Sequence, residues 1–177
     1  GGSLANRTRF GVEIVKAIRA AVGEDFPIIF RFSQWKQQDY SAKLCQTEEE
    51  LATFLGLLSD AGVDMFHAST RRFWLPEFEG SELNLAGWAK KLTNKPVITV
   101  GSVGLDEDFI GEGNADLKGT SNPTNIDGLL ERLTNDEFDL VAIGRALLVD
   151  PDWVNKIKDK KEDEIAPFNK EALMTLS

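Results

Sequence analysis

Two short apolar segments of this chain end at glycines, and the residues at these ends have the chemistry of an anion-binding site. Residues 96–104 run through Gly101-Ser102, and residues 138–151 run through Gly144-Arg145 into a helix-like stretch. Bounded β-branched runs of this kind are typical of buried parallel strands. Glycines leave backbone N–H groups accessible beside a helix start, and arginine binds phosphate through two parallel hydrogen bonds. The pattern predicts a site for a phosphate-bearing cofactor or substrate.

A further cation, Arg31, lies inside a strand-like segment. The period-2 alternation of a strand directs it to the face opposite that of Phe30 and Phe32. An arginine that points into the interior of a parallel sheet costs several kcal/mol unless it meets an anion. Two interpretations remain open: Arg31 binds a ligand anion, or it forms an ion pair with one of the chain's many acidic residues.

Other groups near the strand ends leave a structural and a functional interpretation open. His67, the only histidine, ends an apolar run and has no evident catalytic or metal-binding partner nearby. The RRFW run at 71–74 suits a pocket wall built from stacking and cation–π contacts, and equally a clamp on the acidic loop at 77–82. The segment WKQQDY at 35–40 is either a pocket rim or a solvated loop. Cys45 has a single lysine nearby to activate it, so it is a weak candidate nucleophile.

The overall composition excludes several classes of partner. The 177 residues are 42% hydrophobic and 28% charged, as in one ordinary globular unit, and a net charge of −9 argues against nucleic acid or an anionic membrane surface. One cysteine excludes an internal disulfide framework and a cysteine-rich zinc site, so we expect no metal and a reducing, cytoplasmic location. No apolar run reaches the length of a membrane span. The motifs of P-loop, hydrolase, zincin and Rossmann proteins are absent.

After an initial helix at 4–22, the hydrophobic pattern alternates between strands and helices. The predicted strands cover 27–32, 63–68, 96–100 and 139–143, and the predicted helices after them cover 47–60, 83–92, 124–133, 146–149 and 152–158. Such alternation implies right-handed crossovers and a parallel sheet, which makes the fold class α/β. In an eight-stranded α/β barrel, the loops after the last two strands form the usual phosphate site.

A polar stretch interrupts this alternation between Asp106 and Asn122, where Gly111, Gly113 and Gly119 stand close together. It follows the third predicted strand, so it emerges on the face where barrel enzymes carry their function. A functional loop and a tolerated surface insertion are both consistent with this composition.

The first ten residues, GGSLANRTRF, resemble the Y-G-G-S-x-x-N-R-x-R-F signature of the Old Yellow Enzyme (NADH:flavin oxidoreductase) family. The resemblance continues through FRFS, GVDMFHAS, PVITVGSVG and FDLVAIGRALLVDPDW, and into the tail APFNKEALMTLS. It implies a TIM (βα)8 barrel that carries FMN and uses NAD(P)H to reduce electron-poor alkenes, the activity of an ene-reductase.

The resemblance also implies roles for the candidate site residues. Arg31 would contact the flavin pyrimidine near N1 and O2, where a cation stabilises the charge of the reduced ring. The FMN phosphate cradle would consist of Gly101, Ser102, Gly144 and Arg145.

The family's catalytic residues have no counterpart in this chain. They are expected in an N-terminal half-barrel that these residues lack, and Tyr40, the only tyrosine, is not at the position of the family's proton donor. His67 and Arg71 would lie near the flavin-facing loop without a defined role. The identity of the catalytic residues is therefore left unknown.

We accordingly expect residues 1–177 to form one C-terminal half-barrel, βα units 5–8, which is inactive alone. The strands that contain Ile28 and Val141 would have unpaired edges, so the expected partner is the missing half or a second copy of the chain. Alternatives from other classes are a non-catalytic half-barrel or scaffold that binds a phosphorylated ligand, and a barrel enzyme that acts on a sugar phosphate.

Overall fold

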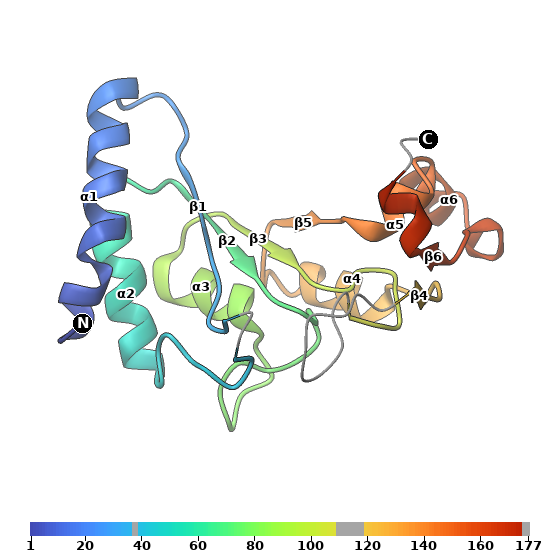
Figure 1. Cartoon of the computed structure of the whole chain (residues 1–177), viewed down its shortest axis with the longest axis horizontal. Coiled ribbons are helices and arrows are strands. Elements are labelled where there is room, and N and C mark those ends of the chain that lie inside the picture. The colour runs from blue at the N-terminus through green and yellow to red at the C-terminus, as the bar shows by residue number, and fades with distance from the viewer. Residues whose placement is uncertain (37–38, 109–118, 175–177) are drawn as a thin grey trace.

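A four-stranded parallel sheet forms the centre of the computed structural model, which describes residues 1–36, 39–108 and 119–174 (Figure 1). The strands are β1 (Ile29–Phe32), β2 (Met65–Ser69), β3 (Val97–Val100) and β5 (Leu140–Ala142), paired in the order β1-β2-β3-β5. The prediction of an α/β fold with about four parallel strands is confirmed. Each observed strand starts one or two residues later than predicted.

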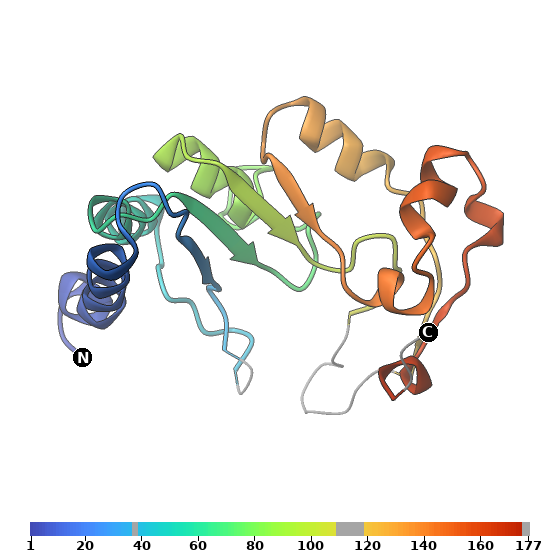
Figure 2. The same cartoon turned by 90° about the horizontal axis from the view of Figure 1, so that it is seen from above.

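Helices connect the strands and cover one side of the sheet (Figure 2). They are α1 (Leu4–Val22), α2 (Glu48–Asp60), α3 (Leu85–Thr93), α4 (Asp127–Thr134), α5 (Arg145–Val149) and α6 (Trp153–Lys158), with 3-10 turns η1 (Glu162–Glu164) and η2 (Lys170–Leu173). Figure 2 shows α1 to α4 along one side, while α5 and α6 lie beyond the end of β5. No helix in the described ranges combines the length and the hydrophobicity that a bilayer crossing requires.

The helix ends follow local sequence signals. The Thr47 hydroxyl accepts a hydrogen bond from the Glu50 N–H at the start of α2, which is half of the predicted capping box. The Glu50 carboxylate reaches back to the Gln46 N–H at 2.7 Å. Gly23 ends α1 with φ 82°, and Asn94 ends α3 in the left-handed region. Each cap satisfies backbone groups that a helix terminus leaves unpaired.

The hydrophobic core lies between the sheet and the helices. Phe66 on β2 and Val97 on β3 are fully buried on this side. Phe32 on β1 packs its ring 5.8 Å from that of Phe54 on α2. Full burial of one such side chain contributes about 1.5–3 kcal/mol. The alternation of the strands thereby sends the remaining side chains to the opposite face.

That opposite face, called here the open face, carries a mixed set of side chains. They are Ile29, Arg31, Met65, His67, Ser69, Ile98, Val100, Leu140 and Ala142. The outer strands β1 and β5 each have one partner in the described sheet, and their residues Ile29 and Leu140 are 52% and 50% exposed. The two unpaired edges predicted from the sequence are therefore present in the described sheet.

Hydrogen bonds join Asp106 and Asn122, the two ends of the predicted insertion. The Asp106 N–H donates to the Asn122 carbonyl at 3.0 Å, and the Asp106 carboxylate accepts from the Asn122 N–H at 2.7 Å. Burial raises the pKa of Asp106, but the hydrogen bonds that its carboxylate accepts from Asn122 and Ser121 lower it more, so the pKa lies below its usual value. Gly111 and Gly113 lie outside the described residues.

A small second sheet joins this segment to the tail. Strand β4 (Thr120–Ser121) pairs antiparallel with β6 (Phe168–Asn169), and the sequence pattern predicts neither strand. Two-residue strands have no periodicity to detect. The pairing brings the tail back to the carboxyl end of β3.

Gly101, directly after β3, lies in close contact with Thr70, directly after β2. It has φ +138°, and a Cβ atom there would lie 2.8 Å from both the carbonyl oxygen and the hydroxyl of Thr70. The Gly101 carbonyl also accepts from the Phe73 N–H at 3.1 Å. A side chain at this position would need backbone movement in the neighbouring loop.

We expect Gly101→Ala to lower the free energy of unfolding by about 1–3 kcal/mol, because the methyl group overpacks the Thr70 backbone. Gly56→Ala is the matched control, since Gly56 lies inside α2 and a Cβ atom there would have no neighbour within 4 Å. Alanine there should raise stability by about 0.5–1 kcal/mol through helix propensity. Thermal unfolding of both variants measures this, and equal midpoints would contradict the close approach.

We expect the 177 residues on their own to sediment as a dimer or larger species of the 19.6 kDa chain. Association hides the β1 and β5 edges together with the apolar side chains of the open face. Lysine at both Ile29 and Leu140 should shift the population toward monomer, because charged edges oppose pairing. A monodisperse monomer with a cooperative melt would show that the edges need no partner.

Candidate functional site

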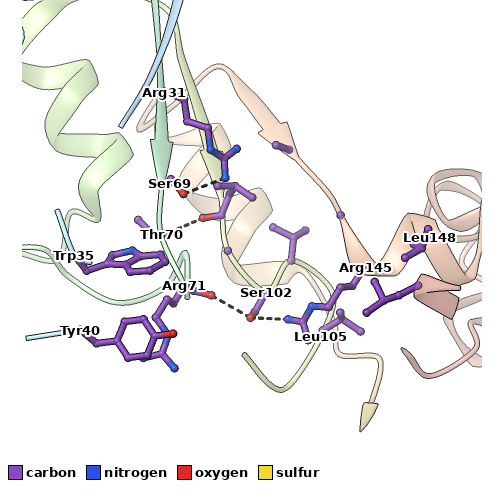
Figure 3. A pocket seen from close by; sticks show the side chains of 16 residues that line it. Arg31, Trp35, Tyr40, Ser69, Thr70, Arg71, Ser102, Leu105, Arg145 and Leu148 are labelled. Atoms are coloured by element: carbon purple, nitrogen blue, oxygen red, sulfur yellow. Dashed lines mark hydrogen bonds between the residues drawn. The ribbon is translucent and has the colours of Figure 1, made fainter. Parts of the chain in front are cut away.

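A pocket of about 520 Å³ lies at the carboxyl end of the parallel sheet (Figure 3). All five residues predicted to form the site line it: Arg31, Gly101, Ser102, Gly144 and Arg145. They come from β1, from the turn after β3, and from the junction of β5 with α5. The pocket has the size that small-molecule and cofactor sites commonly have.

Arg145 is anchored at the end of the pocket formed by β3 and α5. Its Nη2 donates to the Glu107 carbonyl at 2.6 Å and to the Ser102 hydroxyl at 3.2 Å. Its guanidinium carbon lies 5.4 Å from the centre of the Phe168 ring. Burial lowers the pKa of the Arg145 guanidinium, and nearby carboxylates, Asp108 first, oppose that shift. A partly desolvated cation at this position attracts an anion more strongly than one in water.

Backbone geometry beside Arg145 suits close approach by a ligand. Ser102 has φ 48°, in the left-handed region, directly after the positive φ of Gly101. Gly144 precedes α5 without a side-chain cap, and a Cβ there would have no atom within 4 Å. Backbone N–H groups without a side-chain cap, next to backbone with positive φ, can bind anions in proteins.

Arg31 occupies the other end of the pocket and contacts two neutral acceptors on β2. Its Nη1 lies 2.9 Å from Nε2 of His67, and its Nη2 donates to the Ser69 hydroxyl at 3.0 Å. The sequence left open a ligand anion or a structural ion pair. Within the described residues Arg31 forms no ion pair, so the second interpretation is not what the structure has.

Strand register places His67 beside Arg31, although His67 itself does not line the pocket. Arg31 on β1 and His67 on β2 are direct partners in the parallel ladder. Burial lowers the pKa of the His67 imidazole, and the positive charge of Arg31 lowers it further. Because a guanidinium can only donate, the contact with Arg31 requires the imidazole to accept a hydrogen bond, and the lowered pKa favours the neutral form that can do so.

The RRFW run contributes to the pocket and does not clamp the acidic loop. Arg71 Nη2 lies 2.7 Å from one oxygen of Asp108, and Arg72 Nε lies 2.8 Å from the other. Glu77 of that loop instead pairs with Lys43 at 3.0 Å. The clamp on 77–82 was one of two predicted interpretations and is wrong. The pocket-wall interpretation agrees with the position of Arg71.

The WKQQDY segment supplies an aromatic side to the same pocket. Trp35 and Tyr40 both line it, with ring centres 5.2 Å apart, and Arg71 stacks 4.0 Å from the Tyr40 ring centre (Figure 3). The segment is therefore a pocket rim where it is described. Cys45 is fully buried, and burial raises the pKa of its thiol to about 11, which agrees with a weak nucleophile.

Three features of the site escaped the sequence analysis. Ser69, the last residue of β2, and Thr70 directly after it line the pocket beyond the predicted end of the strand. Asp108 pairs with two arginines from a segment that the sequence identified only as a polar insertion. Leu173 of the tail also lines the pocket. The period-2 pattern would have included Ser69 had the strand been extended by one residue.

Comparison with known proteins gives this site a family context. The model of the NADH:flavin oxidoreductase / NADH oxidase family matches residues 1–164. An NADH oxidase from Thermoanaerobacter brockii is 35% identical over an alignment of 176 positions, and the match covers 93% of this chain and 23% of that protein. A bilirubin reductase from Clostridium symbiosum is 30% identical over an alignment of 177 positions, and the match covers 93% of this chain and 42% of that protein. The chain thus spans less than half the length of either relative.

Solved structures show the same fold. The old yellow enzyme homologue from Zymomonas mobilis superposes with a TM-score of 0.67 at 15% identity, over 100% of this chain and 43% of the other. Morphinone reductase in complex with tetrahydroNAD superposes with a TM-score of 0.61 at 19% identity, over 91% and 36%. Old Yellow Enzymes are TIM barrels, so the four-stranded sheet corresponds to part of a barrel. From its family match and its fold, the chain belongs to the NADH:flavin oxidoreductase / NADH oxidase family, that of Old Yellow Enzyme.

Proposed function

We propose that this chain supplies the phosphate-binding and pyrimidine-binding parts of an FMN site in an ene-reductase. The family binds FMN and takes its reducing equivalents from NAD(P)H. The observation that carries the proposal is that Arg31, from the edge strand β1, and Arg145, shortly after the other edge strand β5, line the same pocket.

The phosphate end of the pocket fits a phosphate group in three respects. The Gly101–Ser102 turn has two successive positive φ values, which a Cβ at Gly101 would not allow. The start of α5 lacks a side-chain cap, and Arg145 is held there by the Glu107 carbonyl. Positive charge and backbone N–H groups in one place favour a phosphate over a neutral group.

The Arg31 end of the pocket suits the edge of the flavin pyrimidine where N1 and O2 accept hydrogen bonds. Its guanidinium has donors on both terminal nitrogens and a fixed orientation set by His67 and Ser69. A cation at this edge stabilises negative charge that the ring carries after reduction. Trp35 and Tyr40 add an aromatic wall along the same pocket.

The chemistry that FMN supplies when bound is hydride transfer from a nicotinamide to the β-carbon of an electron-poor alkene. The chain's residues bind and polarise the cofactor, and the group that donates a proton to the substrate lies outside residues 1–177 in this proposal. We further propose that these residues are βα units 5–8 of the barrel and act in the cytoplasm. The free β1 and β5 edges support the half-barrel assignment.

Absorption spectra of the purified complete protein test the proposal directly. We expect flavin bands that FMN restores after removal of the cofactor. A colourless protein that binds inorganic phosphate but not FMN would favour the alternative of a non-catalytic phosphate-binding barrel.

Arg145→Ala should weaken FMN binding in the complete protein by about 1.5–3 kcal/mol, the contribution of a hydrogen bond to a charged group. Fluorescence titration with FMN measures the affinity. Arg9→Ala is the matched control, because Arg9 is an exposed residue of α1 paired with Glu13. Equal affinities for the Arg145 variant and the parent would remove Arg145 from the phosphate site.

Arg31→Met should lower the reduction potential of the bound flavin by about 30–60 mV, the two-electron equivalent of about 1.5–3 kcal/mol. The substitution removes more stabilisation from the negatively charged reduced ring than from the neutral oxidised ring. Anaerobic redox titration gives the potential, and Arg9→Met is the control because Arg9 is an exposed residue of α1 paired with Glu13. An unchanged or raised potential would assign Arg31 a purely structural role.

A further inference from the structure

The open face of the sheet holds a small polar group, Arg31, His67 and Ser69, beside apolar side chains. His67 pairs in register with Arg31 on one side and with Ile98 of β3 on the other. Ile98 in turn pairs with Leu140. The Arg31 guanidinium reaches from β1 toward Ser69 of β2, and both residues line the pocket (Figure 3).

Two neutral acceptors fix the guanidinium. One terminal nitrogen, Nη1, lies 2.9 Å from Nε2 and 3.3 Å from Nδ1 of His67, and the other donates to Ser69 at 3.0 Å. A neutral imidazole has a lone pair on one of these two nitrogens whichever tautomer is present. The contact therefore survives a change of tautomer, but a protonated ring offers no acceptor.

The charges around His67 make its protonation costly. Arg31, from β1, is the charged group that acts on it among the described residues; β3 contributes Ile98, and β2 itself contributes Met65 and Ser69. Burial and the Arg31 charge both lower the pKa of His67. A proton on the ring would place two cations in direct contact.

We propose that His67 is a positioning residue for Arg31, and that its neutral form holds the guanidinium toward the FMN site while protonation releases it. The part of this inference that concerns FMN binding rests on the proposed function, whereas the pairing of His67 with Arg31 concerns residues of this chain alone. It assigns a role to the chain's one histidine and makes flavin binding sensitive to acid.

The first measurement needs no flavin. In the isotopically labelled complete protein without cofactor, the imidazole signal that disappears in His67→Gln is followed by NMR from pH 8 to pH 5. We expect a pKa lowered from its ordinary value in the parent and a higher pKa in Arg31→Met, where burial still lowers it but the Arg31 charge no longer does. The same pKa in both proteins would overturn the pairing.

The second measurement follows FMN affinity over the same pH range. Glutamine at position 67 offers a carbonyl acceptor that does not titrate, whereas methionine offers none. We expect the parent to lose affinity about tenfold as His67 becomes protonated, His67→Gln to lack that loss, and His67→Met to bind about tenfold more weakly already at neutral pH. The FMN phosphate itself titrates near pH 6, and the Gln variant corrects for it.

The two measurements separate failure of this inference from failure of the proposed function. Identical pH profiles for the parent and His67→Gln would overturn the positioning role even when FMN binds. Absence of FMN binding at every pH would overturn the proposed function and the flavin half of the inference, while a shifted His67 pKa would still establish the pairing.

Discussion

The close approach of two strand ends at Gly101 holds the rest of the site in place. There is no room for a Cβ between Gly101 and the Thr70 backbone, so the loop after β2 and the turn after β3 lie in direct contact. Ser102 then places its hydroxyl 3.1 Å from the Arg71 carbonyl and 3.2 Å from Arg145 Nη2. Three successive strand ends are thereby linked through one serine. A larger residue at position 101 would separate these loops and, with them, the cation from the backbone turn.

The parallel sheet was predictable because its strands are apolar runs bounded by glycine or proline. Short apolar runs with such boundaries are typical of strands that are buried on both faces of a parallel sheet, and few other secondary structures give this pattern. The helix predicted at 124–133 begins instead at Asp127, because Thr124 donates its N–H to Gly104 and belongs to the preceding turn. Helix starts without a side-chain cap, as at Ile126, leave no signal in the sequence.

Side-chain partners were much less predictable than strands. The sequence suggested that an inward arginine needs an anion, yet Arg31 finds a histidine and a serine supplied by parallel register. Arg72 meets Asp108, 36 residues further along the chain, although the acidic loop at 77–82 is much closer in sequence. The hydrogen-bond or ion-pair partner of a side chain depends on which strand ends are neighbours in the fold, and the composition of the sequence does not contain that information. Gly101, Ser102, Gly144 and Arg145 converged because each lies shortly after the end of a strand, a position that topology fixes, while Arg31 reaches the same pocket from within β1.

The arginines of the pocket belong to a protein whose net charge is −9. An anion that diffuses toward it first meets a repulsive field, and the guanidinium groups dominate only at short range. Salt screens fields beyond a Debye length of about 8 Å at physiological ionic strength, and it affects partly buried contacts much less. Added salt therefore speeds the arrival of an anionic ligand and changes its dissociation much less, whereas salt slows association in proteins whose net charge attracts their ligands.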